Sequence, residues 1–83
     1  MSTLLSDAVA FSNRELDRVD RRIAQQRERL ERQREIIQEL AAARRDTTTA
    51  TTLFRTMRRT LEAFEEDRRV IEDEMFAARV HRT

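Results

Sequence analysis

The stretch Asp46-Thr47-Thr48-Thr49-Ala50-Thr51-Thr52 is the one interruption in a chain that otherwise has the pattern of a helix. The 83 residues include no Gly and no Pro, so the chain lacks the usual turn formers elsewhere. Thr lowers helix propensity because it is β-branched, and Asp46 or Thr47 can cap a helix that follows. The stretch therefore predicts a turn at residues 46–48 between two long helices.

Before this turn, residues 12–45 are predicted to form the first helix, after an N-terminal arm at residues 1–11. Ser12 and Glu15 fit a capping box at the start of the helix. Apolar or amide residues recur along it at alternating intervals of three and four, which is typical of the a/d seam of a coiled coil. The seam positions are Leu16, Val19, Ile23, Gln26, Leu30, Gln33, Ile37 and Leu40.

After the turn, residues 49–80 show the same alternation and are predicted to form the second helix. The seam positions are Ala50, Phe54, Met57, Leu61, Phe64, Arg68, Ile71, Met75 and Ala78. The two seams are out of phase, because the seven-residue repeat of the first reaches Thr51 whereas that of the second starts at Phe54. Two interpretations remain: a hairpin whose seams face each other, or one long helix that stutters through the Thr-rich stretch.

A pairing test favours the hairpin. In an antiparallel pair each a position faces a d position, and folding the chain about Thr47 satisfies this rule along both seams. The same fold places Gln26 opposite Arg68 and Gln33 opposite Leu61. We therefore predict an all-α fold, an antiparallel two-helix coiled-coil hairpin, spanning residues 1–83. Gln26, Gln33 and Arg68 would form a polar core layer that sets its register.

Charges beside the seams fit the same arrangement. Folding about Thr47 lets Arg29 reach Asp67. It lets Arg22 reach Glu74 in the same way. The full flanking set is Arg22, Arg27, Arg29, Arg34, Glu65, Asp67, Glu72 and Glu74. A parallel dimer of one long helix would instead set the arginines against their own copies.

A two-helix hairpin has one seam and little core, and small scaffolds often gain stability by association. Apolar residues outside the seam favour association, and folding about Thr47 leaves residues 1–10 beyond the end of the second helix. The apolar residues outside the seam are Leu4, Leu5, Val9, Phe11, Ile36, Leu53, Ala63, Val70, Phe76 and Val80. We predict a homodimer that completes a four-helix bundle, with the N-terminal arm covering the open end. The alternative is a frayed terminus with scattered surface apolar residues.

Over roughly residues 16–75 the sequence resembles a group of short helical-hairpin proteins of α-proteobacteria. The residues that carry the resemblance are Ile23–Leu40 with its Gln33–Ile36 run, Asp46-Thr47, Leu53-Phe54 and Leu61. The resemblance implies a helical hairpin and brings no activity with it.

Five arginines near the predicted turn make the most basic surface of the hairpin. They are Arg44, Arg45, Arg55, Arg58 and Arg59. Such a tip could bind a phosphate or the backbone of a nucleic acid. Against this stand a net charge of only +1 and the lack of interleaved aromatic residues for base stacking. An anion held inside the bundle by Arg68 is an alternative to its role in register.

Little in the chain points to catalysis. There is no Cys, and His81, the only His, has no carboxylate cluster beside it, so we expect no metal or cofactor. The acidic runs at 65–67 and 72–74 are typical of solvated or interface charges. No apolar run approaches the roughly 20 residues that span a bilayer, and no signal peptide stands out, so a cytoplasmic protein is expected. We predict a non-enzymatic module that binds itself and a partner protein; the alternative is a nucleic-acid or phosphate-binding accessory protein.

Overall fold

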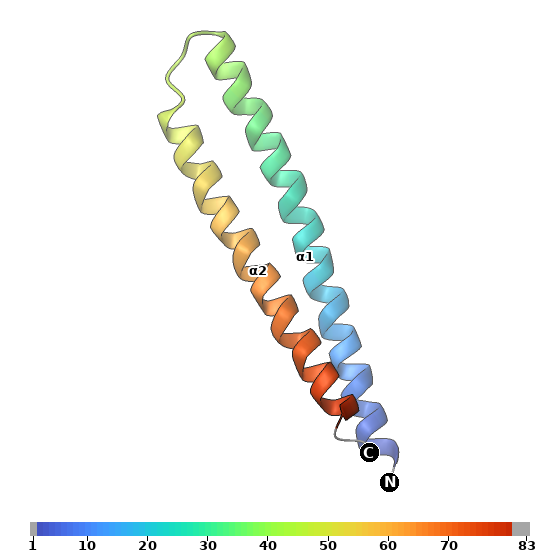
Figure 1. Ribbon diagram of the computed structural model, residues 1–83. Coiled ribbons are helices and arrows are strands. Elements are labelled where there is room, and N and C mark those ends of the chain that lie inside the picture. Colours follow the sequence, from blue (N-terminus) through green and yellow to red (C-terminus); the bar gives the residue numbers. More distant parts are fainter. Residues whose placement is uncertain (1, 81–83) are drawn as a thin grey trace.

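The chain folds into two helices joined by a short turn (Figure 1). The computed structural model describes the backbone of residues 2–80 and the side chains of residues 7–80. Helix α1 spans Ser2–Ala42 and helix α2 spans Thr48–Val80. They run antiparallel, so the start of α1 and the end of α2 lie at the same end of a rod of 65 × 15 × 13 Å. The predicted all-α hairpin is confirmed, and the single long helix is wrong.

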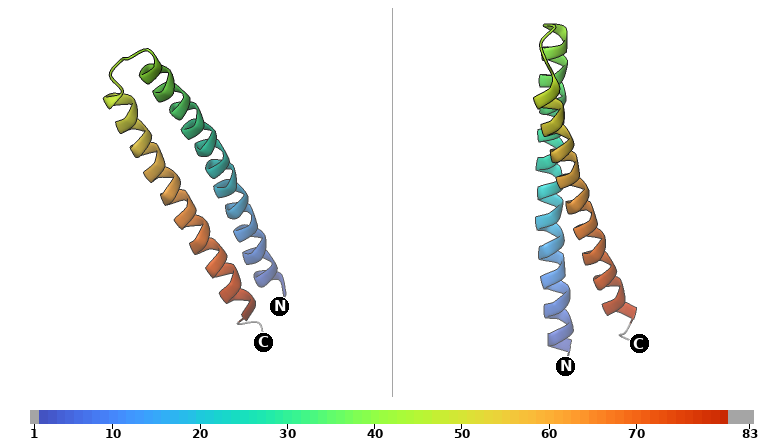
Figure 2. Two further views of the ribbon diagram at one scale, coloured as in Figure 1. Left: turned by 45° about the horizontal axis from the view of Figure 1, so that its top comes forward. Right: turned by 90° about the vertical axis from the view of Figure 1, so that its left-hand side faces the viewer.

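The two helices twist around each other along the rod. In Figure 1 they lie apart beside the turn and close together near the termini. The perpendicular view in Figure 2 shows the reverse, with overlap at the turn and separation near the termini. The direction from α1 to α2 therefore rotates along the hairpin, which keeps the side chains of both seams between the helices.

Helix α1 begins at Ser2, ten residues before the predicted start at residue 12. Ser12 therefore lies inside the helix, and residues 2–11 form its first turns instead of a separate arm. Ala and Leu favour helix in this segment, and no Gly or Pro ends it. Phe11 and Phe76 are 58% and 68% exposed in the single hairpin, and the predicted cover of the open end in a dimer stays a prediction.

The end of α1 also differs from the prediction, because the helix ends at Ala42 and not at residue 45. The N–H of Arg45 donates to the carbonyl of Leu40 at 2.9 Å, and the N–H of Arg44 donates to that of Ala41 at 3.0 Å. This pair of bonds is a Schellman motif, which requires a left-handed residue after the helix. Arg44 takes that role with φ of 55°, although the left-handed region costs a non-glycine residue about 1–2 kcal/mol.

The sequence left open whether Asp46 or Thr47 caps the second helix, and both residues contribute bonds at the start of α2. Thr48 donates its hydroxyl at 2.6 Å and its backbone N–H at 2.9 Å to Oδ1 of Asp46. The N–H of Thr51 donates to the carbonyl of Thr47 at 2.8 Å, which is the first backbone bond of the helix. The hydroxyl bond, followed by the backbone bond, lowers the pKa of the Asp46 carboxyl below its ordinary value. The turn thus occupies residues 43–47 and not 46–48.

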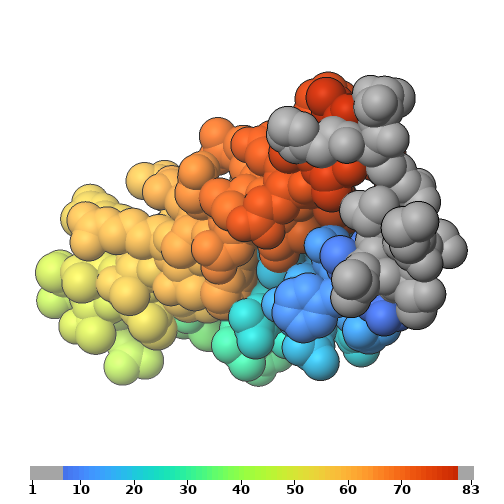
Figure 3. Space-filling view, turned by 90° about the horizontal axis from the view of Figure 1, so that it is seen from below, coloured from blue at the N-terminus to red at the C-terminus, as the bar shows by residue number. Residues whose placement is uncertain are grey.

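The core is a single line of side chains between α1 and α2. In the view from the terminal end, the atoms of α2 lie directly against those of α1 (Figure 3). All predicted seam positions are buried or half-buried, so both predicted seams are confirmed. The buried side chains among the described residues are Val19, Ile23, Gln26, Leu30 and Gln33, all of them on α1. Helix α2 contributes only half-buried seam residues.

The register between the helices differs from the one predicted by folding about Thr47. Gln26 lies against the carbonyl of Met57, eleven residues before the predicted neighbour Arg68. Arg68 in turn contacts Asp20, six residues before Gln26. The predicted pairing of Gln26 with Arg68 is therefore wrong. A displacement of about one heptad explains both contacts, since it keeps every a position opposite a d position.

Candidate functional site

Two buried amides connect the helices at equal intervals. Nε2 of Gln26 donates to the carbonyl of Met57 at 2.8 Å, and Nε2 of Gln33 donates to that of Ala50 at 2.9 Å. The amides are seven residues apart on α1, and their acceptors are seven residues apart on α2. Within the part of the chain that the structure describes, no buried side-chain nitrogen or oxygen lacks a partner. Gln26 and Gln33 are thus satisfied polar positions in the seam, as a structural role requires.

Arg68 does not join these amides but forms the ion pair that crosses between the helices among the residues that the structure describes. Its Nε donates to Oδ1 of Asp20 on α1 at 2.6 Å, and its guanidinium also pairs with Glu72 on α2. The Arg68 and Asp20 side chains are 39% and 46% exposed, so water screens the pair and its contribution is at most about 1 kcal/mol. A pair of this kind favours one alignment more than it adds stability.

The ion pairs predicted from folding about Thr47 are not formed. Among the described residues, Arg29 pairs with neither Asp67 nor another carboxylate, and Arg22 does not pair with Glu74. The reason is the displaced register, which carries each arginine past its predicted carboxylate by about two helical turns.

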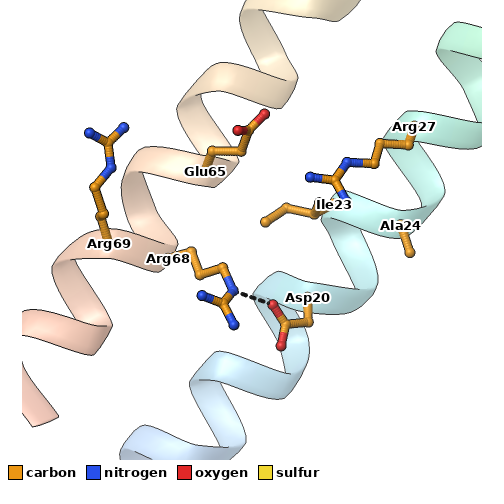
Figure 4. Close-up of a pocket in the computed structure, with 7 residues that line it drawn as sticks. All are labelled: Asp20, Ile23, Ala24, Arg27, Glu65, Arg68 and Arg69. Atoms are coloured by element: carbon orange, nitrogen blue, oxygen red, sulfur yellow. Dashed lines mark hydrogen bonds and ion pairs between the residues drawn. The ribbon is translucent and has the colours of Figure 1, made fainter.

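Arg68 and Asp20 lie in an open groove of about 630 Å³ between the helices (Figure 4). Arg68 points across the groove to Asp20, whereas Arg69 points away from α1. The groove is lined by Asp20, Ile23, Ala24, Arg27, Glu65, Arg68 and Arg69. Because its carboxylates oppose its arginines and Arg68 is already paired, the groove offers no concentrated positive charge to an anion.

The predicted basic tip is spread along the molecule and not gathered at one point. Arg44 and Arg45 lie in the turn, and all five arginines of the tip are exposed. Arg55 and Arg59 lie seven and eleven residues after Thr48, which places them roughly 10 to 16 Å along α2 from its start. The turn therefore brings two of the five arginines together, and the remaining three follow one side of α2.

Uncharged residues that the sequence presented only as scattered lie along one side of α2 in the structure. Leu53, Thr56, Thr60 and Ala63 follow one another at intervals of three, four and three. Val70 continues the line seven residues on, after Asp67 at the intervening position. We call the five uncharged residues of this line the outer face of α2. Leu53 and Val70 are 49% and 47% exposed, so the face is open. The three-and-four spacing was the signal in the sequence.

The hydroxyl groups on this side of α2 are already bonded within the helix. Thr52 donates to the carbonyl of Thr48 at 2.9 Å, and Thr56 donates to that of Thr52 at 3.3 Å. Thr60 continues the series with a bond to the Thr56 carbonyl at 3.2 Å. The outer face could therefore be buried without leaving a hydroxyl donor unpaired.

The described residues contain no group of three His, Cys, Asp or Glu side chains that could hold a metal ion. His81 lies outside them. Neither α1 nor α2, over the part described, has an apolar stretch that could cross a membrane.

No protein-family model, curated protein or solved structure matches the chain. The resemblance to short hairpin proteins of α-proteobacteria therefore stays an expectation. A function has to be inferred from the contacts, exposure and charges of the chain itself.

Proposed function

We propose that the chain is a non-enzymatic module for protein–protein interaction, in which two coiled-coil hairpins associate into a four-helix bundle. One observation carries the proposal: α2 has no buried residue, although most of its seam positions are apolar. Phe54, Met57, Leu61 and Phe64 are all half-buried between the helices. A second hairpin against α2 would remove the remaining apolar surface from water, which favours association.

The exposed area of the chain supports association. The chain exposes 6871 Å², whereas a compact monomer of its mass, 9.9 kDa, is expected to expose about 5,200 Å². The excess of about 1,700 Å² per chain is about twice the roughly 800 Å² that each partner buries in a standard protein interface. Two rods packed side by side through an interface of standard size would cover about half of this excess.

The small size of the core also supports association. Val19, Ile23 and Leu30 are the buried apolar side chains of the described chain. Small scaffolds with so little core usually gain their stability from a disulfide, a metal or association, and this chain has no Cys. Association is the remaining route that its sequence favours.

Multi-angle light scattering and thermal melting on the purified chain test the proposal. A dimer should have twice the chain mass of 9.9 kDa, and its Tm should rise with protein concentration because association stabilises the folded state. A mass of one chain at tens of micromolar, with a Tm independent of concentration, would contradict the proposal.

Nucleic-acid or phosphate binding by the basic tip is the second candidate, and the observation in its favour is charge. The five arginines of the tip are exposed, and their guanidinium groups form no ion pair among the described residues. Binding through them should weaken steeply as salt rises.

A nucleic-acid column tests this candidate. Retention should be lost when the arginines of the tip are changed to Gln, that is Arg44, Arg45, Arg55, Arg58 and Arg59. The matched control changes five other exposed arginines, which are Arg14, Arg21, Arg22, Arg32 and Arg79. No retention at moderate salt, or an equal loss in the control, would exclude the tip as a specific site.

A further inference from the structure

We infer that the second copy docks on the outer face of α2, with the two α2 helices antiparallel and Arg59 of each beside Glu66 and Asp67 of the other. The inference rests on the proposed self-association and specifies its surface and direction. Four of the six large apolar residues exposed in the described chain lie on α2, which makes α2 the contact helix. The five residues of the outer face are uncharged, and the hydroxyls of Thr56 and Thr60 are bonded within the helix. Asp67 lies between Ala63 and Val70 on the same line and is the charge that Arg59 of the second copy would meet.

The order of charges along α2 decides the direction. Residues 55–59 contain three arginines and no acid, and residues 62–67 contain four acids and no base. Parallel α2 helices would place each block against its own copy, which costs free energy. Antiparallel helices related by a twofold axis between Thr60 and Ala63 would place each basic block against the acidic block of the partner.

The same axis matches the apolar residues. Leu53 lies seven residues before Thr60, and Val70 lies seven residues after Ala63, so each Leu53 would meet the other copy's Val70. Two residues of similar exposure, 49% and 47%, would thus cover each other. The small side chains of Thr60 and Ala63 at the axis allow a close approach of the two helices.

The seam side of the contact would be covered as well. Met57 and Phe64 border the outer face on its seam side and are half-buried in the hairpin. The axis sets Met57 of one copy near Phe64 of the other, where both become part of the core of a four-helix bundle. A twofold contact of this kind uses the same patch on both copies, and therefore closes at two chains.

Arg59 and Glu66 lie on the solvent side of the contact. Arg59 has no ion-pair partner among the described residues, whereas Glu66 pairs with Arg69 on its own helix at 2.9 Å. The Arg69 and Glu66 side chains are 69% and 62% exposed, so the Glu66 carboxylate can also pair with an arginine from a second copy. Each dimer would contain the intermolecular contact twice.

Sedimentation equilibrium on four variants tests the surface and the direction. Leu53→Glu places a charge on the outer face and should convert the dimer to a monomer of unchanged helicity. Phe76→Glu is the matched control, because it changes an exposed apolar residue of α2 outside the face and should leave the dimer intact. Arg59→Glu alone should weaken the dimer by about tenfold, since two attractive contacts become repulsive. Arg59→Glu combined with Glu66→Arg should restore the dimer.

The outcomes separate the two proposals. A monomeric parent chain would overturn both self-association and this interface. A dimeric parent whose mass is unaffected by Leu53→Glu would overturn the interface and leave self-association standing. Loss of the dimer with Leu53→Glu, but no recovery when the charges at positions 59 and 66 are exchanged, would overturn the antiparallel arrangement.

Discussion

The two seams of this hairpin face each other but are not equally buried. The seam of α1 has five buried side chains, among them Ile23 and Leu30, whereas the seam of α2 has none. The first half of the α2 seam is built from large residues such as Phe54 and Phe64, both of which stay half-buried between the helices. Burial by a single partner helix is therefore uneven, and the helix with the larger side chains has apolar surface left for another contact.

Truncating one Leu in each seam should change the free energy of unfolding most, and by different amounts in the two seams. Leu30→Ala should cost about 2–3 kcal/mol of unfolding free energy, because it opens a cavity in the buried seam. Leu61→Ala, at a half-buried position of α2, should cost about half as much. Urea unfolding followed by circular dichroism, in the Leu53→Glu background that removes association, measures both. Equal losses would mean that the two seams are buried alike.

Replacing the buried amides should have the next largest effect. Gln26→Leu with Gln33→Leu exchanges polar seam positions for apolar ones and should raise the free energy of unfolding by about 1 kcal/mol, at the expense of a unique alignment. Gln38→Leu, at an exposed position of α1, is the control and should change stability little.

The alignment itself can be followed with a short bismaleimide cross-linker, since the parent chain has no Cys. Cysteines at Asp20 and Arg68 should cross-link within one chain, and cysteines at Gln26 and Arg68 should not. Efficient cross-linking of the second pair would contradict the observed register.

Substitutions at the C-terminal end of α1 should change the stability of the hairpin less than those in the seams. Arg44→Gly should stabilise the hairpin by about 0.5–1 kcal/mol, because Gly adopts positive φ without strain but loses more backbone entropy on folding. Arg45→Gly, at the next position, has no positive φ to relieve and should destabilise. Thermal melting of both variants separates relief of strain from a general effect of Gly.

Removing the Asp46 carboxylate at the start of α2 should have the smallest effect on stability, and this effect should depend on pH. The bonds from Thr48 lower the pKa of Asp46, so its contribution to stability is complete above its ordinary pKa, about 3.9, and is lost as pH falls through the lowered value. Asp46→Ala should therefore lower the Tm at pH 7 and have little effect at strongly acidic pH. A difference in Tm that stays constant over this range would exclude the charged carboxylate as the cause.

Sequence patterns predicted most of the fold but only part of the site. Both seams follow from spacing alone, because a helix that packs on one side must repeat its apolar residues every three or four positions. The start of α1 was mistaken because Ser12 and Glu15 fit a capping box, yet a capping pattern does not stop a helix whose preceding residues also favour helix. The Schellman motif at Arg44 could not be foreseen, since Arg rarely takes the left-handed conformation.

By itself, the sequence determined that two amphipathic helices form, that they are antiparallel, and which residues lie between them. The register could be read only from the packed helices, because moving one helix by seven residues keeps every a position opposite a d position and leaves the pattern unchanged. The choice between these equivalent alignments depends on where the turn closes and on contacts such as Arg68 with Asp20, which exist only once the helices are packed.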